Sequence, residues 1–140
     1  MITLPRALCA LTLTFAAAAA QAEVVVVMSA KSPVTTLTQA QVSDIFLGKL
    51  STFPQGGQAV PIDLASGAAQ RDEFYTKVTG RTAVQLKSYW AKQSFSGKGT
   101  APKAVSGDEE MKKLIAANPN TIGYIEKSSL DASVKAVFAP

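Results

Sequence analysis

Apolar and polar residues follow two different periods along this chain, and each period predicts a different kind of element. Residues 24–28 form an uninterrupted apolar run rich in valine, which is typical of a strand buried on both faces of a mostly parallel sheet. Shorter apolar runs at 60–64, 121–125 and 134–138 predict three further strands. Pro61 lies near the start of its run, where a missing backbone donor does least harm.

Apolar residues at helical spacing predict four helices between these strands. Three of them begin with a capping-box pattern, at Thr38–Gln41, Thr82–Gln85 and Ser106–Glu109. The fourth is predicted over 66–78. The same spacing favours core packing over a ligand-stacking platform for three aromatic residues, Tyr89, Trp90 and Phe95. Because strands and helices alternate, the sequence predicts an α/β fold, a three-layer sandwich with a mostly parallel sheet.

The N-terminus has the three parts of a secretory signal peptide. Arg6 supplies a positive charge, a long uncharged apolar run follows it, and small residues suited to a signal peptidase end at Ala22. We therefore expect a cleaved signal peptide over residues 1–22, a single domain over residues 23–140 and a periplasmic location. A transmembrane anchor and a lipid anchor at Cys9 are the alternatives.

Composition narrows the chemistry that the chain can perform. It has 14 basic and 10 acidic residues, no histidine, and one cysteine, which lies in the predicted signal peptide. The usual zinc sites and nucleophile–histidine pairs are therefore excluded, and we predict no enzyme, no catalytic residue, no metal and no cofactor. The basic residues are spread out, with Lys112-Lys113 the only adjacent pair, which argues against a nucleic-acid partner. Asp63 and Glu126 are interpreted as lone structural carboxylates, with Asp63 as a catalytic base the minor alternative.

A candidate anion site follows the second predicted strand. A helix N-terminus presents unpaired backbone N–H groups, and the helix predicted from Ser66 lacks a capping box because Ala69 cannot reach back. Gly67 lets a ligand approach the backbone, and Arg71 supplies a fork of donors. The alternative is that Ser66 is an ordinary N-cap and Arg71 a solvated surface charge.

Residues just past the first strand are weaker candidates for the same site. Ser29, Lys31 and Ser32 are expected at the same sheet edge as Ser66, because ligands of open α/β sheets bind beyond the carboxyl ends of the strands. The alternative, which is favoured, is that they are ordinary loop residues.

Several short motifs resemble those of phosphate-type periplasmic substrate-binding proteins. Residues 42–49 followed by Phe53-Pro54 are similar to one stretch of that family, and residues 122–126 are similar to one of its strands. Ser66-Gly67 stands where the family has its Ser-Gly-Thr phosphate loop. These motifs occur in the family's order, and together they span nearly the whole chain after the predicted signal peptide.

The resemblance extends to a short single-lobe subgroup through Tyr89-Trp90 and residues 95–99. It implies the fold of one lobe of a type 2 periplasmic binding protein, and an ABC-type transport system as partner. It also implies a bound phosphate or related oxyanion. The ligand-binding residues expected from motif and spacing together are Ser66, Gly67, Ala68 and Arg71, with Ser29 and Ser32 as weaker candidates.

Two departures from the family pattern keep a second function open. First, two ligand donors are missing, since the threonine of the family's loop is Ala68 here and its upstream arginine is Ile62. Second, full-length members have two lobes, whereas this chain has room for one. The alternative is therefore a ligand-free interaction or sensory module of the same fold. Such a module would dock on a membrane transporter or sensor, or on a second copy of the chain.

Overall fold

The computed structural model describes residues 23–140, so the predicted signal peptide and Cys9 lie outside the described residues. Its centre is a five-stranded sheet with the order β3-β2-β4-β1-β5. The strands are β1 (Val24–Ser29), β2 (Val60–Leu64), β3 (Lys103–Val105), β4 (Thr121–Glu126) and β5 (Val134–Phe138). β2 runs parallel to both β3 and β4, whereas β1 runs antiparallel to β4 and β5. All strands except β1 therefore point the same way, which confirms the mostly parallel sheet.

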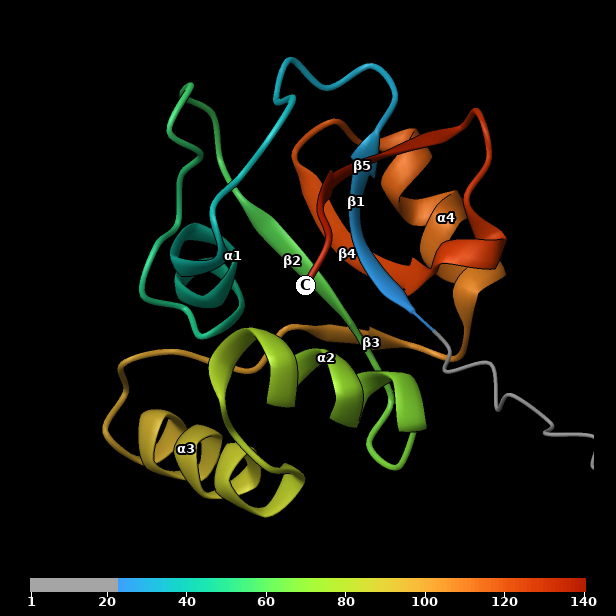
Figure 1. Ribbon diagram of the computed structural model, residues 1–140. Helices are drawn as coiled ribbons and strands as arrows, with labels where there is room; N and C mark the ends of the chain where they lie inside the picture. The colour runs from blue at the N-terminus through green and yellow to red at the C-terminus, as the bar shows by residue number, and fades with distance from the viewer. Residues whose placement is uncertain (1–22) are drawn as a thin grey trace, which may run out of the picture.

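The sequence predicts the burial of β1 correctly but not the direction in which this strand runs. All six of its residues are buried, as the uninterrupted apolar run predicts. Its register pairs Val24 with Glu126 and Met28 with Ile122, so its carboxyl end lies beside the amino end of β4. Since β2 is parallel to β4, the residues that follow β1 and those that follow β2 leave the sheet at opposite edges (Figure 1).

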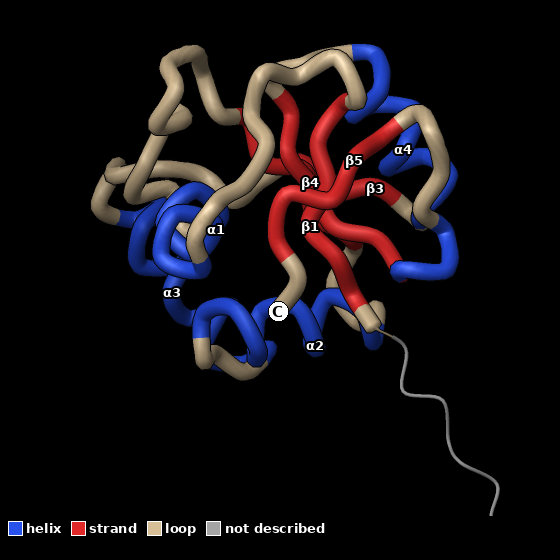
Figure 2. The backbone as a smooth tube through the Cα atoms, turned by 45° about the horizontal axis from the view of Figure 1, so that its top comes forward, coloured by secondary structure: helices blue, strands red, loops and turns tan. Residues whose placement is uncertain are grey.

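Helices cover both faces of this sheet. They are α1 (Gln39–Phe46), α2 (Ala69–Thr79), α3 (Ala83–Phe95), α4 (Asp108–Ala117) and the short 3₁₀ helix η1 (Lys127–Ser129). α4 packs on one face, α1 and α2 pack on the other, and α3 lies at the outside of that second layer (Figure 2). The structure thus confirms the three-layer α/β sandwich.

Two neighbouring residues of β4 show how the layers meet. A Cβ atom built on Gly123 would lie 2.5 Å from both Ile115 and Met111 of α4, so the missing side chain lets that helix approach the sheet closely. Tyr124 points to the opposite face, where its ring stacks on Phe74 of α2 at a centroid distance of 4.0 Å. The alternation of side chains along one strand therefore separates the two halves of the core.

Local sequence signals place two of the helix starts correctly. Thr38 and Gln41 form a reciprocal capping box at the start of α1, and Thr82 and Gln85 form another at the start of α3. In each case the threonine hydroxyl accepts from the glutamine N–H, and the glutamine side chain accepts from the threonine N–H. Both predictions are confirmed.

The third predicted capping box is wrong. α4 has Gly107 as its N-cap, and no side chain caps that end. The N–H and hydroxyl of Ser106, which lies one residue before the N-cap, instead donate to the Glu110 carboxylate, at 3.0 and 2.8 Å. The short strand β3 itself was not predicted.

The aromatic residues of α3 divide between the two sides of the helix. Trp90 is buried and Tyr89 half-buried, as core packing predicts. Phe95 is 96% exposed, so its predicted place in the core is wrong. At 100° per residue Phe95 lies on the side of α3 opposite to Leu86 and Trp90, which are the two residues that this helix buries.

Candidate functional site

The turn between β2 and α2 differs from the predicted helix start. Gly67 has φ +94°, a conformation that side-chain-bearing residues rarely adopt, and it turns the chain before the helix begins. α2 starts at Ala69, and its N-cap is Ala68, which has no side chain to close the helix end. Ser66 is therefore not an N-cap, and its hydroxyl makes no hydrogen bond to another described residue.

Backbone donors at this turn are partly free. The N–H groups of Gly67, Ala69 and Gln70 donate to no residue between 23 and 140. The N–H of Ala68, which was expected to bind the ligand, already donates to the Ala65 carbonyl at 3.2 Å. The Ala68 N–H is thus already used within the turn, whereas the next two N–H groups along the chain have no partner among the described residues.

Arg71 is held in place rather than solvated. Its Nε lies 3.4 Å from Oδ2 of Asp63, and its guanidinium carbon lies 5.3 Å from the centre of the Tyr75 ring. Only 13% of the side chain is exposed. Its two terminal nitrogens donate to no described residue, so the fork remains open for a ligand.

Asp63 is the buried centre of a hydrogen-bond network, not a lone carboxylate. Its Oδ1 accepts from the Leu64 N–H at 2.8 Å and from the Tyr124 hydroxyl, and its Oδ2 accepts from the Tyr75 hydroxyl at 2.8 Å and from Arg71. Because both oxygens are already occupied by donors, Asp63 is poorly placed to act as a base. Its role is to hold the Arg71 guanidinium.

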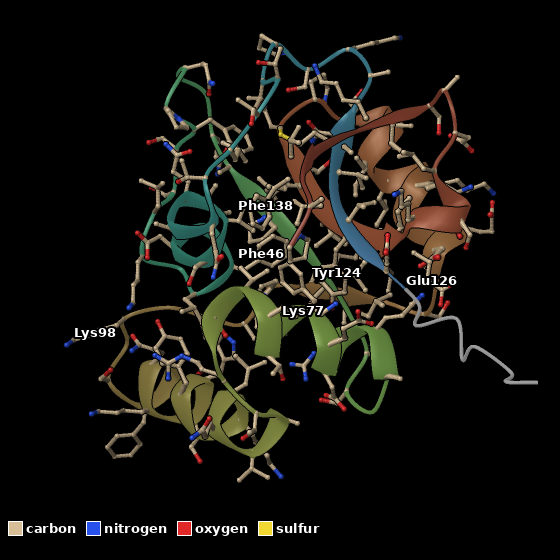
Figure 3. The ribbon with its side chains drawn as sticks, viewed as in Figure 1. Phe46, Lys77, Lys98, Tyr124, Glu126 and Phe138 are labelled. Carbon is tan, nitrogen blue, oxygen red and sulfur yellow. The ribbon has the colours of Figure 1, made fainter. Side chains whose placement is uncertain are left out.

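The two tyrosines come from different layers of the core. Figure 3 shows Tyr124 beside Phe46, in the space between the sheet and the helices α1 and α2. Burial, together with the negative charge of Asp63, raises the pKa of both Tyr75 and Tyr124 well above the usual value. These hydroxyls therefore stay protonated and act as donors.

The raised pKa values of the two tyrosines predict that stability falls at alkaline pH. Above about pH 10 the unfolded chain loses tyrosine protons that the folded chain retains, so the free energy of unfolding should drop as pH rises, by about 1.4 kcal/mol per pH unit for each tyrosine. Urea unfolding at several pH values above that point measures the slope. Tyr124→Phe should remove about half of the tyrosine-dependent slope, while lysines contribute equally to both proteins. Identical slopes in the two proteins would contradict the assignment.

The turn and Arg71 open into one pocket of about 460 Å³. It is lined by Ser66, Gly67, Arg71, Ala83, Val84, Lys87, Trp90 and Ala101. Sequence reasoning missed Lys87, because nothing local connects α3 with the β2–α2 turn. The indole nitrogen of Trp90 is buried and has no hydrogen-bond partner among residues 23–140. The pocket wall thus carries two cationic side chains and no carboxylate.

Ser29 and Ser32 are elsewhere. Because β1 is antiparallel to β4, they lie at the edge opposite to Ser66, and the expectation of a shared edge is wrong. Both are buried, and their hydroxyls serve local structure. The Ser29 hydroxyl donates to the Ala116 carbonyl at 3.3 Å, and the Ser32 hydroxyl accepts from the Val34 N–H at 3.2 Å. Ser29 is the last residue of β1 and Ser32 lies in the loop after it, and neither lines the pocket at Arg71.

Comparison with solved structures identifies the architecture. An ABC-type phosphate transport receptor from Vibrio cholerae superimposes with a TM-score of 0.66 at 20% identity, over 83% of this chain and 45% of the receptor. A protein from Clostridium perfringens, assigned to the phosphate ABC transporter substrate-binding proteins and crystallised with bound phosphate, gives 0.66 at 28% identity, over 83% and 44%. The fold is that of one lobe of such a binding protein. PstS from Borrelia burgdorferi superimposes with a TM-score of 0.58 at 14% identity, over 83% of this chain and 46% of PstS.

The lobe spans less than half the length of these proteins. No family model and no curated protein matches its sequence. The two comparison structures are a transport receptor and a protein assigned to the substrate-binding proteins. Among residues 23–140, no helix has the length and apolar character needed to cross a bilayer, and no group of side chains is arranged to hold a metal ion.

Proposed function

We propose that this chain is an exported solute-binding domain that binds a small oxyanion, with phosphate as the first candidate, for an ABC-type transport system in the periplasm. The observation that carries the proposal is the open fork of Arg71, which Asp63 holds at the wall of the pocket beside Ser66 and Gly67. The comparison structures that support it are a phosphate transport receptor and a phosphate-type substrate-binding protein with phosphate bound.

The donors suit a tetrahedral anion. The guanidinium offers two terminal nitrogens in one plane, and the start of α2 adds free N–H groups at its positive end. The Ser66 hydroxyl adds a neutral donor, and the Lys87 ammonium a second positive charge. A wall with two cations and no carboxylate attracts either phosphate or sulfate, so the pocket favours oxyanions as a class.

Titration calorimetry with sodium phosphate and sodium sulfate tests this proposal. Arg71→Ala should weaken binding by about tenfold to a hundredfold, because a hydrogen bond to a charged group contributes about 1.5–3 kcal/mol. Ser66→Ala should weaken it by several-fold. Arg71→Lys, which keeps the charge and loses the planar fork, should fall between wild type and Arg71→Ala.

The matched control is Lys113→Ala, which removes one cation from α4 on the other face of the sheet. It should bind as wild type does, and circular dichroism should show that all variants are folded. An absence of heat at millimolar ligand, or equal binding by wild type, Ser66→Ala and Arg71→Ala, would refute the oxyanion site.

An interaction role, the alternative that the sequence left open, has support from a different feature. Val84 and Phe95 of α3 are large apolar side chains that are 75% and 96% exposed. Exposed apolar side chains gathered on one element often mark a contact with a partner. Val84 also lines the pocket at Arg71 and Phe95 does not, so this surface adjoins the pocket at one end of α3.

A further inference from the structure

α3 buries one apolar side against the protein and exposes a second apolar stripe to solvent. Its buried side consists of Leu86 and Trp90, and the opposite side exposes Val84, Ala91 and Phe95. These three residues are seven and four positions apart, so they form one narrow stripe along the helix. A stripe of this kind on a helix that already buries its other side has no structural use within the described fold.

The surroundings of this stripe are strongly basic. Residues 74–107 contain six basic side chains and no acidic one: Lys77, Arg81, Lys87, Lys92, Lys98 and Lys103. Lys87 and Lys92 lie on the two flanks of the stripe, and both are exposed. Lys87, Lys92 and Lys98 form no ion pair with any residue in the described part of the chain. The charges of Lys92 and Lys98 are therefore available to a partner, while Lys87 is shared with the pocket at Arg71.

A groove runs beside the stripe. It has a volume of about 830 Å³, and its wall includes Arg81, Tyr89, Lys92 and Lys98. The Arg81 guanidinium stacks 4.7 Å from the centre of the Tyr89 ring, which fixes one cation in the groove. Lys98 extends away from the body of the protein (Figure 3). Three cations around an open groove suit phosphate groups.

We propose that this α3 face, defined as Val84, Lys87, Ala91, Lys92, Phe95 and Lys98, docks on an anionic lipid surface. Phe95 and Val84 would enter the boundary of the acyl chains, while the lysine ammonium groups reach the headgroup phosphates. The face has a narrow apolar centre with cations on both flanks. A protein partner would instead need roughly 1,000 Å² of buried interface, which the exposed side of one 13-residue helix, about 20 Å long and about 10 Å wide, does not supply.

Vesicle co-sedimentation of the full chain tests the proposal. The chain should sediment with vesicles of equal parts phosphatidylglycerol and phosphatidylcholine, and high salt should release much of it. Phosphatidylcholine vesicles measure attachment through apolar segments that does not depend on lipid charge. The double variant Lys92→Glu, Lys98→Glu should lower the charge-dependent binding by on the order of tenfold or more. Phe95→Ser should lower it by several-fold.

Matched variants separate this face from net charge and from apolar surface in general. Lys31→Glu with Lys113→Glu makes the same change of net charge at exposed positions outside the face, and Leu130→Ser removes an apolar side chain that is 40% exposed. Both should bind phosphatidylglycerol vesicles nearly as wild type does. Equal losses in these controls, or no difference between the two kinds of vesicle, would overturn the proposal. Retention on polyglutamate that Phe95→Ser leaves unchanged, without vesicle binding, would also overturn it, since it would indicate an acidic protein partner.

Discussion

Replacing Asp63 with alanine is expected to lower the free energy of unfolding by about 3–5 kcal/mol, because the change leaves buried donors without a partner. Asp63 is 3% exposed and accepts hydrogen bonds from Tyr75, Tyr124 and Arg71 as well as from the backbone. After its removal, two buried hydroxyls and a largely buried guanidinium must find water or stay unsatisfied. Urea unfolding followed by circular dichroism measures the loss.

Asp72→Ala is the matched control for this change. Asp72 is an exposed aspartate in the first turn of α2, and its removal should change stability by no more than about 0.5–1 kcal/mol. Asp63→Asn keeps the shape and one acceptor oxygen but turns an amide donor toward other donors, so it should be intermediate. If Asp63→Ala proved as stable as Asp72→Ala, the hydrogen bonds of Asp63 would contribute little to the free energy of unfolding.

Phe74→Ala should destabilise the protein by about 3–5 kcal/mol, through lost burial and the cavity left behind. Phe74 is fully buried, stacks on Tyr124 at 4.0 Å and meets Phe46 edge-on at 4.7 Å. The same substitution at Phe95, which is 96% exposed, should change stability by less than about 0.5 kcal/mol. Paired denaturation curves measure both effects. Similar losses at the two positions would mean that Phe95 is buried in solution.

The features that the sequence predicts well are local. The capping boxes at Thr38 and Thr82 depend on residues three positions apart, and the burial of β1 depends on five consecutive apolar residues. The direction of β1 is not local, because it is set by pairing with β4, about a hundred residues later. Placing Ser29 on the same edge as Ser66 failed for that reason alone.

The candidate site shows the same division. Ser66, Gly67 and Arg71 are close in sequence, and the structure brings them together at one pocket. Tyr124 and Lys87 join the network and the pocket from distant elements, and no nearby pattern connects them to Asp63 or Ser66. The one local signal for the network was an aspartate inside an apolar strand, which requires buried donors wherever it occurs.

Because β1 lies between two strands that come late in the chain, its pairing determines when during synthesis this protein can fold. β1 is the first strand to be synthesised, yet its two neighbours β4 and β5 are the last strands of the sheet. Closing so long a loop carries a large entropic cost and slows folding of chains with distant contacts. Until residues near Glu126 are available β1 has neither partner in place, and until residues near Phe138 are available it still lacks β5. While β4 and β5 are missing, β1 stays unpaired and the sheet has no centre.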